Sequence, residues 1–272
     1  MLEDELKTAV ALARGGGDII NQIYGRDVQV AYKSPSDPVT EADEKVNRYI
    51  VRELSQAFPG DAIIAEESAL DAAAAGHARC WYVDPLDGTK EFLARNGEFS
   101  VMIGLAIDGR ARLGVVYRPD GDKLYRGVVG QGAVLEHAGS ETPLHVSGIA
   151  DPSALRLVVS RSHRPATTEA LMRALGITHE RPSGSVGLKV GLIAEQQADL
   201  YVHHSGHASR WDSCGPEAIL RAAGGRFTDL FGEDIIYDGR EIKNKRGLFA
   251  CNAAAFDAVL PVVRAAAEQG ID

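Results

Sequence analysis

The segment with the most candidate functional residues in this sequence is the acidic hexapeptide Asp84-Pro85-Leu86-Asp87-Gly88-Thr89. An apolar run that predicts a strand ends at Asp84, and a turn at Pro85 would bring Asp87 back beside it. Magnesium prefers oxygen ligands and often shares its coordination sphere with a substrate phosphate. Gly88 permits backbone angles that turn amides toward a phosphate, and the Thr89 hydroxyl can hold an attacking water. A plain turn is the alternative, but the complete hexapeptide after an apolar strand favours phosphate chemistry.

Three other acidic segments lie at the ends of predicted elements. Glu66-Glu67 follows an apolar strand, Asp212 begins a helix, and Thr40 and Asp43 begin another. Each has an ordinary structural explanation, namely a solvated loop, a first-turn carboxylate and a helix cap. Two metal ions about 4 Å apart can clamp the attacking and leaving oxygens of a phosphoryl displacement. Because such a site needs carboxylates from several segments, the four segments together predict it.

The elements that must position these residues alternate between helices and short strands. Within the first predicted helix, three consecutive glycines at 15–17 indicate a bend or close packing. The predicted helices span 3–24, 41–57, 167–175, 186–197, 211–225 and 254–268. The predicted strands span 62–65, 80–83, 99–107, 111–117, 123–129, 133–136, 155–160, 198–203, 226–230 and 247–251.

This order of elements predicts a mixed α+β and α/β chain of stacked layers. The stretch 137–152 is rich in Gly, Ser, Thr and Pro and separates two halves. We expect an N-terminal α+β unit over 1–145, which carries most of the candidate metal ligands. A C-terminal α/β unit over 146–272 would carry Asp212 and the residues that determine substrate specificity.

Composition excludes several classes of function. The chain has 272 residues, 45% of them hydrophobic, and a formal net charge of -9, which gives no general attraction for nucleic acid polymers. No run approaches the ~18 apolar residues of a membrane span. The acidic, amphipathic N-terminus does not resemble a signal peptide, so we expect a cytoplasmic protein. Cys80, Cys214 and Cys251 form no metal-binding pattern, which indicates free thiols.

The motifs, taken in order, resemble the inositol monophosphatase superfamily of magnesium-dependent, lithium-sensitive phosphatases. Glu66-Glu67-Ser68, the hexapeptide from Asp84 and Trp211-Asp212 carry this resemblance, which extends from about residue 39 to residue 228. Within the superfamily the chain is most similar to the CysQ and bisphosphate nucleotidase branch. That similarity rests on five features: the segments 87–92 (DGTKEF), 96–100 (NGEFS), 160–163 (SRSH) and 211–217 (WDSCGPE), and Lys189 after Gly187-Leu188. The resemblance implies a layered α-β-α-β-α sandwich.

The resemblance also implies roles for individual residues. Two to three Mg²⁺ ions are expected: one on Glu66, Asp84 and the carbonyl of Leu86, a second on Asp84, Asp87 and Asp212, and a third held loosely through water on Glu66. Thr89, hydrogen-bonded to Asp43, would help to deprotonate the attacking water. The residues expected to contact the phosphate or the nucleotide are Gly88, Thr89, Lys90, Ser160, His163, Lys189 and Arg210, the last at a position where lysine is common.

Some positions leave questions open. His203, His204 and His207 do not have metal-binding spacing, and we expect them in an exposed loop beside the site. Val186 and Gly187 lie where relatives often carry serine, which leaves the sugar and base contacts there undefined.

Three functions remain as hypotheses. The first is removal of the 3′-phosphate from adenosine 3′,5′-bisphosphate, giving AMP, by a monomer or homodimer with a small phosphorylated nucleotide as its only expected partner. Inositol or sugar phosphatase activity is the second, against which Lys90-Glu91 argues. The third is a non-catalytic nucleotide sensor, against which the complete set of expected ligands argues.

Overall fold

The computed structural model describes residues 2–26, 30–34, 37–69, 74–162 and 167–270. Its main helices are α1 (Glu3–Ile23), α2 (Glu41–Ala57), α3 (Thr89–Leu93), α4 (Thr167–Leu175), α5 (Val186–Ala194), α6 (Arg210–Ala222) and α7 (Phe256–Glu268). Strands β1 (Val30–Ser34) and β2 (Asp37–Thr40) form a small antiparallel hairpin. The remaining strands form two larger sheets, described below.

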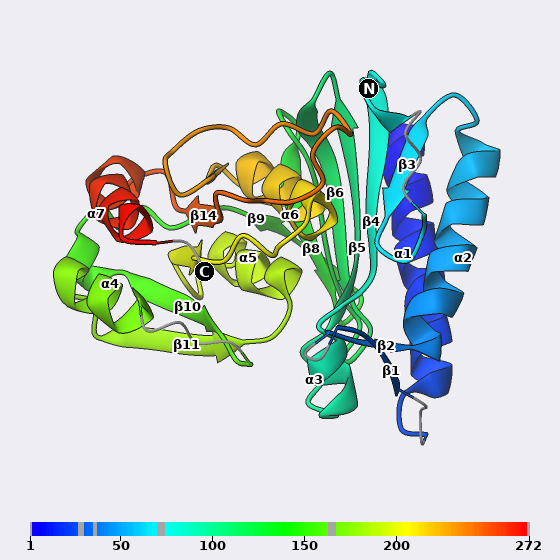
Figure 1. Ribbon diagram of the computed structural model, residues 1–272, viewed down its shortest axis with the longest axis horizontal. Coiled ribbons are helices and arrows are strands. Elements are labelled where there is room, and N and C mark those ends of the chain that lie inside the picture. Colours follow the sequence, from blue (N-terminus) through cyan, green and yellow to red (C-terminus); the bar gives the residue numbers. More distant parts are fainter. Residues whose placement is uncertain (1, 27–29, 35–36, 70–73, 163–166, 271–272) are drawn as a thin grey trace.

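Five layers alternate through the molecule (Figure 1). Helices α1 and α2 cover one face of a seven-stranded sheet, and α5 and α6 pack on its other face. Helix α5 also packs against a five-stranded sheet, whose outer side shares an apolar core with α4 and α7. This arrangement confirms the layered α-β-α-β-α sandwich and the mixed fold class that the sequence predicts.

The seven-stranded sheet runs in sequence order from β3 to β9. It contains β3 (Ala62–Ala65), β4 (Arg79–Asp87), β5 (Ser100–Ile107), β6 (Arg110–Arg118), β7 (Lys123–Val128), β8 (Gly132–His137) and β9 (Ser140–Leu144). Strands β3 and β4 are parallel, and every later pair is antiparallel. The middle strands β4 and β5 are almost completely buried because helices cover both faces of this sheet.

The five-stranded sheet has the order β11-β10-β12-β14-β13. Its strands are β10 (Arg156–Ser160), β11 (His179–Ser183), β12 (Leu200–His203), β13 (Arg226–Thr228) and β14 (Leu248–Cys251). Strands β10, β11 and β12 are mutually parallel, and β14 pairs antiparallel with both β12 and β13. The parallel ends of β10 and β12 therefore lie at one edge of the sheet, where Ser160 and His203 stand close to the pocket described below.

The three glycines of α1 serve close packing rather than a bend, since the helix continues through them. A Cβ on Gly17 would lie 2.3 Å from Cε1 of Tyr117 on β6, and one on Gly15 would lie 2.4 Å from the hydroxyl oxygen of Tyr49 on α2. Both distances are far below van der Waals contact. Glycine here lets α1 approach the sheet and α2 closely.

The sequence does not predict four short elements, namely the β1–β2 hairpin, α3, β9 and β11. Strands β9 and β11 are edge strands, and all of their side chains except Leu144 and Ser183 are exposed, so no alternating apolar pattern marks them. In the alanine run 72–75, predicted as a surface loop, residues 72 and 73 lie outside the described residues, Ala74 is buried and Ala75 is exposed.

Two further predictions concern membrane spans and the division of the chain into two units. No helix among the described residues is long and apolar enough to cross a membrane. The change from one sheet to the other falls between β9 and β10, but α5 and α6 from the second half pack on the first sheet. The division into units 1–145 and 146–272 therefore stays a prediction.

Candidate active site

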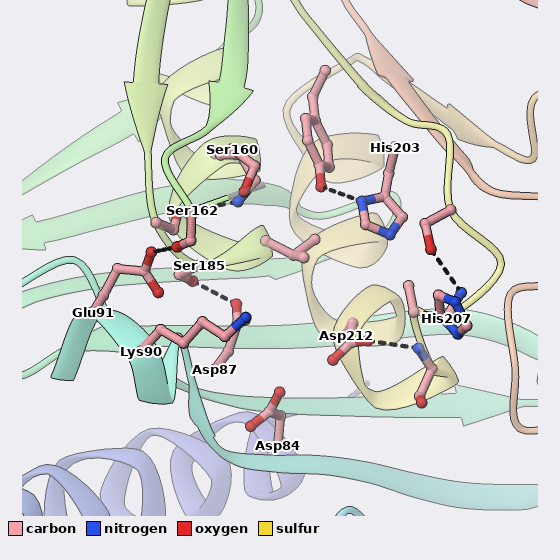
Figure 2. Close-up of a pocket in the computed structure, with 18 of the residues that line it drawn as sticks. Asp84, Asp87, Lys90, Glu91, Ser160, Ser162, Ser185, His203, His207 and Asp212 are labelled. Carbon is pink, nitrogen blue, oxygen red and sulfur yellow. Dashed lines mark hydrogen bonds between the residues drawn. The ribbon is translucent and has the colours of Figure 1, made fainter. Parts of the chain in front are cut away.

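Four of the predicted carboxylates line one pocket of about 680 Å³ between the two sheets. Figure 2 shows Asp84, Asp87 and Asp212 at its base. Glu66 follows β3, Asp84 and Asp87 lie in β4, and Asp212 lies in the first turn of α6. The structure thus brings together acidic residues from three segments that are far apart in the sequence, as a metal-dependent phosphate site requires.

A bulge in β4 places Asp84 and Asp87 on the same side of the sheet. Asp84 pairs with Met102 of β5, whereas Asp87 pairs with Ser100, so three steps along β4 match two steps along β5. Without the extra residue, side chains three apart would face opposite sides. Pro85 suits the bulge because it has no N–H to offer the ladder. The strand therefore continues through Pro85, and the prediction that proline ends it at Asp84 is wrong.

Burial and mutual repulsion make this carboxylate group a site for positive charge. Burial, followed by the charges of Glu66, Asp87 and Asp212, raises the pKa of Asp84 well above its usual range. The same causes, burial first and then Asp87 and Glu66, raise the pKa of Asp212 to about 7. Each carboxylate is costly to ionise while the others are charged, so a bound cation would stabilise the ionised set.

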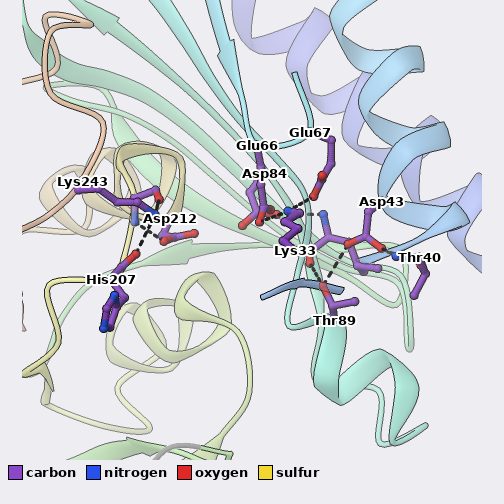
Figure 3. Close-up of polar contacts among 12 residues, drawn as sticks. Lys33, Thr40, Asp43, Glu66, Glu67, Asp84, Thr89, His207, Asp212 and Lys243 are labelled. Atoms are coloured by element: carbon purple, nitrogen blue, oxygen red, sulfur yellow. Dashed lines mark hydrogen bonds and ion pairs between the residues drawn. The ribbon is translucent and has the colours of Figure 1, made fainter. Parts of the chain in front are cut away.

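Lys33 of β1 supplies one such positive charge, and no prediction from the sequence includes it. Its ammonium lies 2.9 Å from Oε1 of Glu66 and also pairs with Glu67 (Figure 3). These two carboxylates raise the pKa of Lys33 despite its partial burial. No local motif surrounds Lys33, and only the pairing of β1 with β2 brings it to the pocket, so a single sequence carries no signal for it.

The predicted contact between Thr89 and Asp43 is formed. The Thr89 hydroxyl donates to Oδ1 of Asp43 at 3.0 Å and lies 3.3 Å from the carbonyl oxygen of Leu86 (Figure 3). Oδ2 of Asp43 accepts hydrogen bonds from the backbone N–H of Thr40 at 2.7 Å and from its hydroxyl at 2.6 Å. The predicted capping box at the start of α2 is therefore present, and it fixes the carboxylate that orients Thr89.

Gly88 and Lys90 line the pocket next to Thr89. Gly88 has φ of +98° and precedes α3, so it adopts the left-handed conformation that glycine tolerates best. A Cβ there would lie 3.1 Å from the carbonyl oxygen of Glu98. Both the backbone angle and the close neighbour explain glycine at this position.

The opposite wall holds the predicted nucleotide contacts. Ser160 at the end of β10 and Lys189 in α5 both line the pocket. Lys189 is buried; its ammonium donates to the carbonyl of Gly184 at 3.2 Å and lies 5.2 Å from the ring centre of Tyr201. Burial lowers its pKa, while Asp87 and Glu91 oppose that shift. His163 lies outside the described residues.

Arg210 is not among the described residues that line the pocket. Its guanidinium turns toward the chain segment after β13, where it donates to Asn244 and to the carbonyl of Glu241 at 3.3 Å. It also lies 5.8 Å from the ring centre of Tyr237. These partners hold the side chain outside the pocket lining, and its contact with the substrate stays a prediction.

Three histidines line the pocket, and only the exposed His207 fits the expected exposed loop beside the site. His203 ends β12, His204 is buried, and His207 lies in the following loop, together with Lys243. Nδ1 of His203 lies 3.2 Å from the hydroxyl oxygen of Tyr201 (Figure 2). The clustering of these histidines in the sequence indicates a candidate functional segment, but only the fold shows that this loop closes one side of the pocket.

The donor set fits divalent metal ions in its chemistry. Among the described residues, no group of three or more His, Cys, Asp or Glu side chains is close enough to hold an ion as the side chains stand. Nevertheless Glu66, Asp84, Asp87 and Asp212 share one pocket, and carboxylate oxygens are the ligands that Mg²⁺ prefers. The Lys33 ammonium between Glu66 and Glu67 shows that this pocket already accommodates a cation.

A pocket lined by carboxylates, between the two sheets of a five-layer sandwich, is the arrangement expected of a metal-dependent phosphatase. The chain belongs to the inositol monophosphatase family, whose sequence profile matches residues 1–267.

Several relatives are similar over most of their length. The 3′(2′),5′-bisphosphate nucleotidase CysQ of Escherichia coli K12 is 37% identical over 233 residues, which is 85% of this chain and 92% of that protein. The 3′(2′),5′-bisphosphate nucleotidase 1 of Dictyostelium discoideum is 30% identical over 90% of this chain and 91% of its own.

Solved structures agree with this assignment. CysQ from Bacteroides thetaiotaomicron superposes with a TM-score of 0.79 at 28% identity, covering 92% of this chain and 97% of that one. The IMPase of Thermotoga maritima superposes with a TM-score of 0.82 at 26% identity, covering 98% and 99%.

Proposed function

We propose that this protein is a magnesium-dependent phosphomonoesterase that removes the 3′-phosphate of adenosine 3′,5′-bisphosphate, giving AMP and phosphate. The observation that carries the proposal is the pocket in which Asp84, Asp87 and Asp212 lie beside the hydrogen-bonded pair Thr89–Asp43. Identity of 37% to CysQ over most of both chains supports the choice of a bisphosphonucleotide as substrate.

Each residue of the pocket would have its own role in the reaction. Asp43 accepts the proton of the Thr89 hydroxyl, which leaves the Thr89 oxygen free to accept a proton from water. The backbone amides near Gly88 and the ammonium of Lys90 would face the phosphate, since both residues line the pocket. The water oxygen would bond to phosphorus, and its proton would pass to Thr89. The bond from phosphorus to the 3′-oxygen would break at the same time, and the 3′-oxygen would take up a proton from solvent and leave as a hydroxyl. Ser160 and Lys189 would hold the rest of the nucleotide.

Magnesium, when bound, would supply charge neutralisation for the phosphate and acidify the attacking water. We propose that Glu66, Asp84, Asp87, Asp212 and the carbonyl of Leu86 hold two to three ions, and that lithium inhibits the enzyme. A cytoplasmic location and a monomeric or homodimeric state stay predictions.

A phosphate-release assay over a panel of substrates tests the proposed activity. Purified protein is incubated with adenosine 3′,5′-bisphosphate, inositol 1-phosphate or fructose 1,6-bisphosphate, with magnesium or with a chelator. We expect magnesium-dependent release that is fastest from the bisphosphonucleotide. Brisk hydrolysis of inositol phosphate with none of the nucleotide would show the substrate assignment to be wrong.

The variant Asp87→Asn tests the carboxylate site. We expect it to abolish turnover while the far-UV circular dichroism stays that of the wild type, because the substitution keeps the shape of the side chain and removes its charge. Substantial remaining turnover would exclude a role for Asp87 in holding magnesium.

Inositol phosphatase activity is a second candidate. The overlap with the Thermotoga IMPase over 98% of this chain favours it. The same panel decides between the two candidates, and the ratio of kcat/KM for the two substrates is the deciding quantity.

A further inference from the structure

Ser185 has a backbone conformation that a serine rarely adopts. It lies between β11 and α5 with φ of +47° and ψ of 132°, in the left-handed half of the map. Such a conformation costs free energy for any residue with a Cβ, and glycine would adopt it more easily. Strained residues of this kind gather at functional sites, and Ser185 lines the acidic pocket. The serine side chain must therefore make interactions whose favourable free energy offsets the strain.

The contacts of its hydroxyl show what that is. The Ser185 Oγ donates to Oδ2 of Asp87 at 2.6 Å (Figure 2). It accepts the backbone N–H of Leu188 at 3.1 Å and lies 2.9 Å from Oγ of Ser100 on β5. A hydroxyl has one proton to give and two lone pairs. Because that proton goes to Asp87, Ser100 must be the donor in the Ser100–Ser185 contact, which fills the capacity of the hydroxyl.

The surrounding backbone holds Ser185 in this place. The N–H of Gly187 also donates to Oδ2 of Asp87, at 3.1 Å. Gly184 donates its N–H to Glu98 at 2.7 Å, and a Cβ on Gly184 would lie only 2.4 Å from the carbonyl oxygen of Glu98. The loop before α5 is therefore pressed against the segment 98–100, and Ser185 has little freedom to turn away from Asp87.

We infer that Ser185 is a positioning residue that fixes the Asp87 carboxylate for a divalent cation. Two hydrogen bonds from the start of α5 end on Oδ2, which sets the plane of the carboxylate and leaves Oδ1 for the pocket. A donor behind a metal-binding side chain orients it and tunes its affinity for the ion. This inference rests on the proposed metal-dependent function and adds to it a residue that does not itself contact the ion.

The test measures metal affinity directly. Chelator-treated wild type, Ser185→Ala and Ser185→Gly are titrated with Mn²⁺, and the dissociation constant is followed by calorimetry and by the electron paramagnetic resonance of free Mn²⁺. We expect both variants to bind the metal about 10–100-fold more weakly. We also expect metal-free Ser185→Gly to unfold at the same or a higher urea concentration than the wild type, because glycine relieves the strain at φ of +47°.

Ser183→Ala is the matched control, since it removes a buried serine hydroxyl at the end of β11, two residues before Ser185, that bonds only to the neighbouring Gly184 carbonyl among the described contacts. We expect wild-type affinity from it. Mn²⁺ affinity within twofold of the wild type in both Ser185 variants would overturn the inference, even if their turnover fell. A wild type that binds no Mn²⁺ would instead overturn the proposed function. A wild type that binds Mn²⁺ but leaves the nucleotide intact would correct only the substrate, and the inference would stand on the affinities.

Discussion

At the scale of single residues, Thr89 illustrates how a weakly acidic hydroxyl is prepared for proton transfer. Its proton points at Asp43, which itself is fixed by the N–H and hydroxyl of Thr40. Burial raises the pKa of Asp43, while these hydrogen bonds lower it. The carboxylate is therefore held in one orientation by donors on both oxygens. The lone pairs of Thr89 remain directed toward the pocket.

Substitutions at Thr89 test this arrangement. Thr89→Val keeps the shape of the side chain but removes the hydroxyl, and we expect kcat to fall by about 10²–10⁴-fold with a much smaller change in KM. Thr89→Ser keeps the hydroxyl and should retain most of the activity. Steady-state kinetics on the bisphosphonucleotide gives both constants. Wild-type kcat in Thr89→Val would contradict a role for the hydroxyl in proton transfer.

The sequence is informative at this scale where a residue belongs to a local motif. Asp84, Asp87 and Thr89 lie within six positions, so their proximity could be predicted. Asp212 could be added because it begins a helix after an apolar strand. Lys33 and Ser185 could not be found, since their contacts with Glu66 and Asp87 arise from segments brought together by tertiary packing. The direction of the Arg210 side chain could not be predicted either, because it depends on Asn244, 34 positions later.

At the scale of elements, α1 shows how glycine sets the distance between a helix and a sheet. Gly17 faces Tyr117, which is buried and donates its hydroxyl to Asp122 at 3.0 Å. Gly15 faces the hydroxyl end of Tyr49, a side chain that is only partly buried. The two glycines therefore differ in how easily their neighbour can move aside.

Alanine at each position should separate these two cases. We expect Gly17→Ala to lower the free energy of unfolding by about 1–3 kcal/mol, because the ring of Tyr117 cannot shift without breaking its packing. Gly15→Ala should stay within about 1 kcal/mol of the wild type, because alanine's better helix propensity offsets the displacement of Tyr49. Urea denaturation at one pH measures both. Equal destabilisation by the two substitutions would show that Tyr117 resists displacement no more than Tyr49 does.

The elements themselves could largely be predicted, and the departures have physical reasons. Long helices and central strands carry strong apolar periodicity, so their positions agree with the structure within a few residues. The bulge in β4 could not be predicted, because Pro85 reads equally well as the end of a strand and as its irregularity. That single extra residue decides whether Asp87 faces the pocket.

At the scale of the whole molecule, acidic groups buried between the sheets make stability depend on pH. Glu217 of α6 accepts the Tyr237 hydroxyl at 2.7 Å, and its Oε1 lies 2.8 Å from Nε of Arg221 without the alignment of a hydrogen bond. Burial raises the pKa of Glu217 to about 7 although Arg221 opposes the shift. The folded protein therefore holds this proton more tightly than the unfolded chain, and stability falls as pH rises between about 4.5 and 7.

Glu217→Gln should remove this part of the pH dependence. Between pH 5 and pH 8, with chelator present throughout, we expect the wild type to lose up to about 3 kcal/mol more stability than the variant. Urea denaturation at four pH values measures the two slopes. Parallel curves for wild type and variant would show that Glu217 is ionised across the whole range.

Magnesium binding should have the opposite pH dependence: it should stabilise the folded protein more as the pH rises, because it requires ionised carboxylates. The raised pKa values of Asp84 and Asp212 mean that protons compete with metal at low pH. At one fixed magnesium concentration, 100 times its dissociation constant at pH 8, we expect magnesium to raise Tm by about 5–10 °C at pH 8 and by less at pH 6. Differential scanning calorimetry with magnesium, or with potassium chloride of equal ionic strength as control, measures the shift. A larger rise at pH 6 would contradict a site built from these carboxylates.

At one point, where Gly215 of α6 crosses Gly104 and Gly114, helix α6 and the seven-stranded sheet approach each other backbone to backbone. A Cβ on Gly104 of β5 would lie 2.4 Å from the amide nitrogen of Gly215, and one on Gly114 of β6 would lie 2.0 Å from the Gly215 carbonyl oxygen. Helix α6 carries Asp212, and β4 beside it carries Asp84 and Asp87, so this close main-chain approach helps to set the spacing of the acidic cluster. The opposite wall, with Ser160, Lys189 and His203, is built from side chains at the ends of separate elements. A protein engineer could therefore rebuild that wall for a different phosphorylated molecule while the frame that spaces the carboxylates stays unchanged.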